Sequence, residues 1–371
     1  MDWTALGIAT GAAAGLVWAW TWWRERRAPP GEHGVIEAIA RAIGLARVAH
    51  ARPPEWHAYH GDVEVGLRMV GGTWELSYRH RAPIDLSANR QWESGEAWAG
   101  LDVQIGDRGF DAAVYIAGDE QRLLVALDPE ARDRVRRAVG EGWSATRGTW
   151  ILELDAEAQD VDGRALHELG LALATSTVTT DDDLLERLMA RTRDETDPGV
   201  LRRLVEVIGE VGGAARLGRL VLGPARAAVR GLALRRLAAA FPEREETIAG
   251  VALLSAATGR LEPELAVALA VALRTVRHAD PEGVLLALLA SEDVTVRAVV
   301  VDSLALVGTP PRAVPVLAPL RDGAGGVIAE RAGAAIAAIQ ARVGDVVGGR
   351  LALVEGQAGG ELAVIDEPER S

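Results

Sequence analysis

The chain has 371 residues, a formal net charge of −13 and no cysteine. The lack of cysteine excludes disulfide bonds, thiolate metal sites and a cysteine nucleophile. All 40 basic residues are arginine, which together with abundant alanine and glycine is typical of codon bias, so the arginine content does not indicate nucleic-acid binding. The length allows two domains, each large enough to bury a core.

The negative charge is concentrated in the middle of the chain. Residues 28–183 contain 27 acidic residues and 15 arginines, which gives a net charge of −12. Residues 184–345 contain 19 acidic residues and 20 arginines, which gives a net charge of +1. A region this acidic, without a basic stripe, argues against a partner with a phosphate backbone. We therefore expect no nucleic-acid partner.

Residues 3–23 carry no charge and are long enough, as a helix, to cross the hydrocarbon core of a bilayer. Four tryptophans lie at the end of this run, directly before the arginines of residues 24–27. This pattern predicts an N-terminal anchor over residues 1–27, with a transmembrane helix and a lipid contact at 3–23. The alternatives are a cleaved signal peptide, which would carry its basic residues before the apolar run, and a buried core helix.

The arginines after the apolar run predict a single-pass membrane protein with the bulk of the chain in the cytoplasm, by the positive-inside rule. The opposite orientation would place the bulk on the periplasmic or extracellular side. Gly7, Gly11 and Gly15 recur at every fourth residue and share one face of this helix. Such a face would allow a homodimer through close helix packing, although the 41 glycines of the chain also explain the spacing by composition alone.

Residues 28–181 are predicted to form an acidic α+β domain with helices packed on one side of a sheet. Of the eleven aromatic residues after the anchor, ten lie between Trp56 and Trp150. Two alternating apolar runs flank Gly71-Gly72 and predict a hairpin. The other predicted elements are a helix that begins near residue 34 and ends near Arg52-Pro53-Pro54, helices from Asp119, from Asp128-Pro129 and over 160–178, and strands near 110–116 and 150–154.

Part of this domain has a weak resemblance to a domain of uncharacterised bacterial membrane-anchored proteins. The resemblance covers residues 106–140 and implies a domain type without an activity. It rests on Gly106, Asp107, Phe110, Asp111, Gly118 and Asp119.

Residues 182–345 read as helices with a period of about 30 residues. The clearest unit has a helix over 282–290, an acidic turn, a helix over 294–307 and a stop at Gly308. Its Asp293, Val296 and Arg297 resemble the signature of HEAT repeats, in particular the bacterial type similar to phycobilisome lyase repeats.

Further residues match that signature earlier in the chain. These are Val229 and Arg230 in one unit and, more loosely, Asp197, Val200 and Arg203 in another, while the unit at Glu264 and Leu265 lacks the arginine. The resemblance implies a solenoid of about five helix pairs over 184–343. It also implies that Arg203, Arg230, Asp293 and Arg297 form a ladder between repeats, although paired surface charges are expected on any solenoid. Residues 346–371 form a glycine-rich tail, interpreted as a small hairpin or a flexible segment.

Candidate ligands for a metal are few. His57 and His60 are three residues apart, but Pro53-Pro54 before them and Gly61 after them disfavour a helix, and a surface loop is the alternative interpretation. No catalytic residue and no cofactor are predicted. The predicted function is a non-catalytic, membrane-anchored scaffold that binds protein partners through its repeats. The alternatives are a ligand sensor or enzyme with a pocket in residues 56–150, and a lyase-like HEAT-repeat protein.

Overall fold

The computed structural model describes residues 34–91, 102–155, 161–178, 183–323 and 326–346. The described residues divide into two compact units, one up to Val207 and the other from Ile208. The division falls inside helix α9 (Pro198–Leu222). The helix contains one non-helical residue, Gly213, with φ of +61°.

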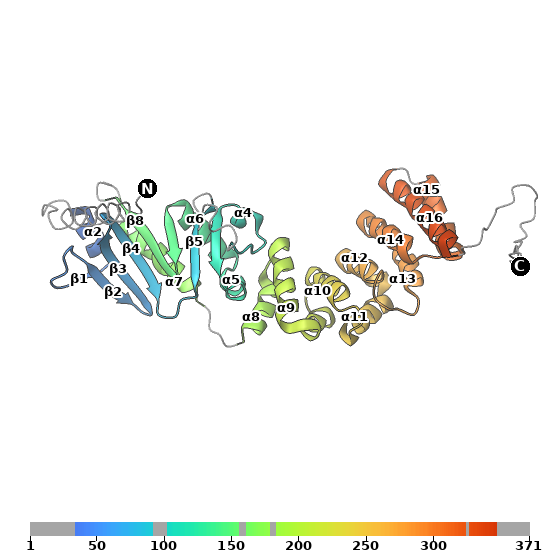
Figure 1. The fold of residues 1–371 in the computed structure, drawn as a ribbon, viewed down its shortest axis with the longest axis horizontal. Coiled ribbons are helices and arrows are strands. Elements are labelled where there is room, and N and C mark those ends of the chain that lie inside the picture. Colours follow the sequence, from blue (N-terminus) through green and yellow to red (C-terminus); the bar gives the residue numbers. More distant parts are fainter. Residues whose placement is uncertain (1–33, 92–101, 156–160, 179–182, 324–325, 347–371) are drawn as a thin grey trace, which may run out of the picture. The chain divides into compact units, whose positions relative to one another are not determined.

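An eight-stranded sheet forms the centre of the first unit (Figure 1). Every pair of neighbouring strands is antiparallel, in the order β1-β2-β3-β4-β8-β7-β5-β6. The strands are β1 (Ala46–Arg47), β2 (Trp56–His60), β3 (Val63–Val70), β4 (Thr73–His80), β5 (Leu86–Arg90), β6 (Val114–Gly118), β7 (Trp143–Thr146) and β8 (Thr149–Leu154).

The predicted hairpin at Gly71-Gly72 is confirmed. Val70 pairs with Thr73, so the connection has two residues, and both glycines have positive φ, +60° and +95°. Such a turn matches the twist of the two strands and requires residues that tolerate positive φ. The register places alternate apolar side chains of β3 and β4 on one face, where they are buried: Val63, Val65, Leu67, Trp74, Leu76 and Tyr78.

Helices cover this buried face. Helix α7 packs on β3, β4 and β8, α6 packs on β5, β7 and α7, and α2 packs on α7. Aspartates cap several of these helices, including Asp119 and Asp128 at the positions expected from the sequence. The helices of the first unit are α2 (Gly34–Ala42), α4 (Arg108–Asp111), α5 (Glu120–Ala126), α6 (Pro129–Gly140), α7 (Gly163–Ser176), α8 (Leu184–Asp194) and the start of α9.

The second unit is helical among its described residues. Helices α10, α12, α14 and α16 pack in series and form one layer, and α11 and α13 each contact the even-numbered helices on either side. Helix α14 has the predicted bounds, with Asp293 as its N-cap. The helices are the rest of α9, α10 (Ala227–Ala240), α11 (Glu245–Ala256), α12 (Pro263–Ala272), α13 (Pro281–Leu288), α14 (Val294–Val307), α15 (Pro310–Gly323) and α16 (Gly326–Val346), with a 3₁₀ turn at Thr258–Arg260.

The transmembrane part of the predicted fold class is corrected, and with it the single-pass localisation. No helix among the described residues combines the length and the apolar character needed to cross a membrane. Residues 3–23, on which both predictions rested, lie outside the described residues, as do Gly7, Gly11 and Gly15 and the tail 347–371. The fold supported by the structure is an antiparallel sheet with helices, followed by a helical region.

Candidate functional site

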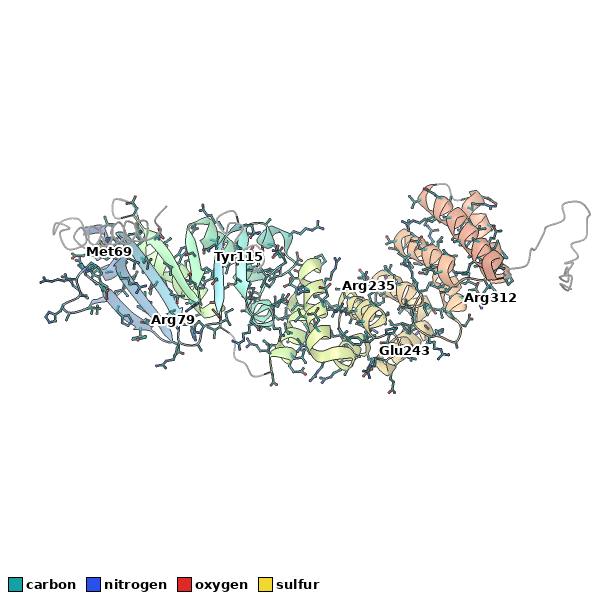
Figure 2. The ribbon with its side chains drawn as sticks, viewed as in Figure 1. Met69, Arg79, Tyr115, Arg235, Glu243 and Arg312 are labelled. Carbon is teal, nitrogen blue, oxygen red and sulfur yellow. The ribbon has the colours of Figure 1, made fainter. Side chains whose placement is uncertain are left out.

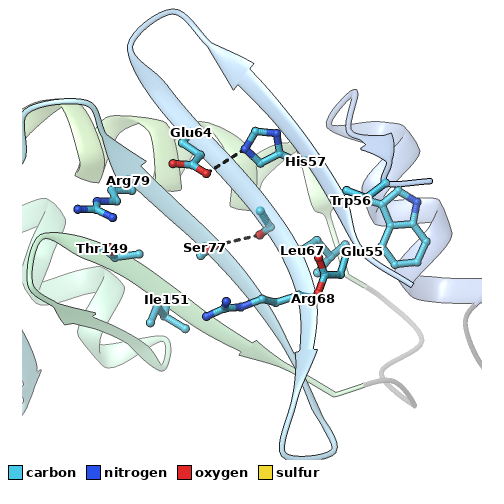
Figure 3. Close-up of a pocket in the computed structure, with 12 residues that line it drawn as sticks. Glu55, Trp56, His57, Glu64, Leu67, Arg68, Ser77, Arg79, Thr149 and Ile151 are labelled. Carbon is cyan, nitrogen blue, oxygen red and sulfur yellow. Dashed lines mark hydrogen bonds and ion pairs between the residues drawn. The ribbon is translucent and has the colours of Figure 1, made fainter. Parts of the chain in front are cut away.

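The face of the sheet opposite α7 carries a shallow depression over β2, β3, β4 and β8. Its volume is about 360 Å³, and its floor is formed by Gly66 and Ser77, which are paired across β3 and β4. Longer side chains surround this floor (Figure 3). A glycine inside a strand often marks a place where another group approaches the backbone closely. The depression is lined by Val48, Glu55, Trp56, His57, Glu64, Gly66, Leu67, Arg68, Ser77, Arg79, Thr149 and Ile151.

Polar contacts fix part of this lining. His57 Nε2 lies 3.0 Å from Glu64 Oε1, the Ser77 hydroxyl donates a hydrogen bond of 3.2 Å to the Gly66 carbonyl, and Arg68 lies 3.7 Å from Glu75. Arg79 on β4, labelled in Figures 2 and 3, is exposed and also lines a second depression at the β2–β3 turn. The open face therefore offers both charge types around a small floor.

The two histidines considered as metal ligands belong to a strand, so the interpretation of this stretch as a loop is wrong. In β2 (Trp56–His60) side chains alternate between the two faces, and His57 and His60, three residues apart, point to opposite faces. His57 lies on the open face beside Glu64. His60 lies on the helix-covered face, where its ring centre is 4.5 Å from that of His167 on α7.

His167 was not predicted as part of any site. Its Nδ1 lies 3.0 Å from the Tyr78 hydroxyl. Burial and the nearby His60 lower the pKa of His167, and burial raises the pKa of Tyr78. The sequence signal that could have located His167 is its position in the middle of an amphipathic helix that must cover the sheet.

A buried ion network ties α6 to the segment between α8 and α9, within the first unit. Arg132 is 5 % exposed and Glu195 is 0 % exposed. The guanidinium of Arg132 donates to both carboxylate oxygens of Glu195, at 2.7 and 3.1 Å, and to Asp107 at 3.0 Å. Arg191 donates to the same carboxylate at 2.9 Å, as do the backbone N–H groups of residues 196 and 197. Each oxygen of Glu195 is thus satisfied by several donors.

Two further contacts join the same elements. Arg203, at the start of α9, pairs with Glu120 on α5 through a bond of 2.8 Å from Nη2 and a second bond from Nε. Gly106 and Gly199 lie so close that a methyl group on either would overlap the backbone of the other. Gly106 also has φ of +97°, a conformation that glycine adopts readily. The first helices after the sheet domain are therefore fixed to it by charge and by backbone contact.

Acid is expected to weaken this network. Burial alone raises the pKa of Glu195, but the hydrogen bonds from Arg132 and from the backbone of Asp197, with the charges of Arg132 and Arg191, outweigh it and lower the pKa to about 2. Between pH 4.5 and 2 the unfolded chain binds a proton that the folded chain does not. Stability present above pH 5 is then lost as the pH falls, on the order of 3 kcal/mol in total.

Urea unfolding at pH 7 and pH 3 measures this loss, followed by tryptophan fluorescence. Every tryptophan precedes residue 151, so fluorescence reports on the first unit. In the Glu195→Gln variant the position no longer titrates. Because pH 3 lies above the folded pKa of about 2, the acid-induced loss of the variant between pH 7 and pH 3 should be smaller by about 2 kcal/mol. Equal losses in the two proteins would contradict the prediction.

The four predicted ladder residues have separate roles. Arg203 pairs with Glu120. Arg230 donates a hydrogen bond of 2.9 Å to the Val221 carbonyl in the last turn of α9. Asp293 is the N-cap of α14 and accepts a hydrogen bond of 2.9 Å from the Val296 N–H. Arg297 has its Nε buried without a hydrogen-bond partner in the described part of the chain. No ion pair joins any two of these four residues.

Other contacts connect the helices of the second unit. Arg274, in the turn after α12, donates a hydrogen bond of 2.9 Å to the Ser303 hydroxyl on α14. The buried carboxylate of Glu282 on α13 accepts hydrogen bonds from the N–H and the hydroxyl of Thr309. Arg312, labelled in Figure 2, pairs with Asp280 at 2.8 and 3.1 Å. These polar contacts connect neighbouring helices of the second unit.

Among the residues that the structure describes, no three or more histidine, aspartate or glutamate side chains are arranged to hold a metal ion. Comparison of the chain with protein-family models, with curated proteins and with solved structures found no match. The resemblance to HEAT repeats therefore stays a prediction from the sequence.

Proposed function

We propose that this chain binds a protein partner through its helical unit, in which pairs of helices similar to HEAT repeats are stacked, while the sheet unit is a spacer or a second recognition module. The observation that carries the proposal is the outer face of α11. Ile248 and Leu253 are 42 % and 47 % exposed, and Ala249, Ala252 and Ala256 on the same face are also exposed.

These five residues lie on one side of α11, because their spacing in the chain follows the helical repeat: 248, 249, 252, 253 and 256. The opposite side of α11 is already used for packing, since Thr247, Gly250, Val251 and Leu254 are buried. Exposed apolar side chains that gather on one face are characteristic of interaction surfaces, whereas single ones are ordinary. Helical stacks also offer extended surfaces of this kind to partners.

The test is capture of partners by cross-linking with the full-length protein in its native extract. The Ile248→Glu/Leu253→Glu double variant is expected to capture at least tenfold less partner than the parent protein, because two charges would have to be desolvated in the contact. Val70→Glu is the matched control, since Val70 is 41 % exposed on β3 in the first unit. Both variants should keep the helical circular dichroism of the parent protein.

Loss of capture in the double variant alone supports the proposal. Equal capture by all three proteins contradicts it and favours the second candidate function, ligand binding in the depression of the open sheet face. That alternative is supported by the small floor at Gly66 and Ser77 and by the charged rim around it.

A further inference from the structure

The imidazoles of His60 and His167 meet where α7 covers the end of β2. Their ring centres are 4.5 Å apart, and the ring planes are inclined at 66°. Both residues are half-buried. The Tyr78 hydroxyl lies 3.0 Å from Nδ1 of His167.

The nitrogen Nε2 of His60 is buried and has no hydrogen-bond partner among the described residues. A buried polar atom without a partner costs free energy, and a bound water or ion is a common explanation for it. His167 shows the complementary feature. Its Nδ1 is engaged by Tyr78, which leaves Nε2 for another contact. In metal sites the second nitrogen of a ligating histidine is usually held in this way, which orients the ring.

The separation of the two rings also suits a shared ion. A metal–nitrogen bond of about 2.0–2.1 Å places each ring centre roughly 3.2 Å from the metal, and two rings at a right angle around it then lie roughly 4.5 Å apart. Right angles between ligands occur in tetragonal and octahedral coordination, which Cu²⁺ and Ni²⁺ adopt with imidazole ligands. We propose that His60 and His167 bind one divalent transition-metal ion of this class through their Nε2 atoms, with water in the remaining positions.

Metal ligation requires neutral imidazole, so binding is expected to weaken as the pH falls. The described residues supply only these two protein ligands, so we expect a modest affinity and an exchangeable ion. Mg²⁺ and Ca²⁺ prefer oxygen ligands and are not expected to compete.

Calorimetric titration of the full-length protein with NiCl₂ at pH 7.5 tests the site. The parent protein should bind one ion at this site, and His60→Gln and His167→Gln should each weaken that binding at least tenfold. His57→Gln is the matched control, because His57 lies on the same strand and is held by Glu64 on the other face. Electron paramagnetic resonance with Cu²⁺ should show two nitrogen donors in the parent protein and in the His57→Gln variant.

The unfolding midpoint from tryptophan fluorescence shows whether each variant is folded. If one of the two glutamine variants fails to fold, the other variant and the Cu²⁺ spectrum of the parent protein still test whether the two histidines bind the metal. Equal Ni²⁺ affinity in a folded His60→Gln or His167→Gln variant, or a Cu²⁺ spectrum without two nitrogen donors, would overturn the proposal.

Discussion

Replacing Glu195 with glutamine is expected to lower the free energy of unfolding of the first unit by about 3–5 kcal/mol. The substitution keeps the size of the side chain but leaves the buried cation Arg132 and the partly exposed Arg191 beside a neutral amide. Arg132 retains Asp107, at 3.0 Å, as its remaining carboxylate. Urea unfolding at pH 7, followed by tryptophan fluorescence, measures the change.

Glu130→Gln is the control for this experiment. Glu130 also pairs with an arginine, Arg134, at 2.6 Å, but its side chain is 84 % exposed. Exposed pairs contribute little, so its loss should cost about 0.5 kcal/mol or less. A similar cost for the two substitutions would show that the buried carboxylate has no special role in stability.

Replacing Gly199 with alanine is expected to destabilise the first unit by about 2–3 kcal/mol. The added methyl group would overlap the carbonyl oxygen of Gly106, and the overlap is with backbone, which cannot rotate away as a side chain does. Relief requires the start of α9 to move, which would also disturb the pair of Arg203 with Glu120. Denaturant unfolding by tryptophan fluorescence is again the measurement.

Gly140→Ala tests whether the effect belongs to the contact or to the loss of a glycine. Gly140 is the last residue of α6, and a methyl group there meets no atom within 4 Å. Alanine is the better helix former, so this substitution should be neutral or stabilising by up to about 1 kcal/mol. Destabilisation of the same size at both positions would contradict the role assigned to the Gly106–Gly199 contact.

The elements set by local chemistry could be predicted from the sequence. Gly71-Gly72 between two alternating runs gave the β3–β4 hairpin, and Asp128-Pro129 marked the start of α6. Asp293 and Gly308 marked the two ends of α14. In each case the signal lies within a few residues of the element that it defines, as turn and cap chemistry requires.

The pairings that depend on distant residues could not be predicted. Pro53-Pro54 and Gly61 suggested a loop around His57, but pairing with β3 makes this stretch strand β2. His60 meets His167, and Arg132 meets Glu195 across 63 residues, only because the tertiary fold brings their elements together. Neither pairing has a fixed spacing in the chain. The candidate site on the open face and the two-histidine cluster both depend on such pairings.

The placement of α8 with the sheet has a consequence for recombination. Arg132, Glu120 and Gly106 lie before residue 184, while their partners Glu195, Arg203 and Gly199 lie after it. A gene fusion with its junction at residue 184 would therefore separate the buried carboxylate of Glu195 from the buried guanidinium of Arg132 and leave each without its partner. A crossover after Arg203 keeps all three contacts in one product, so the sheet and the first helices should be transferred together.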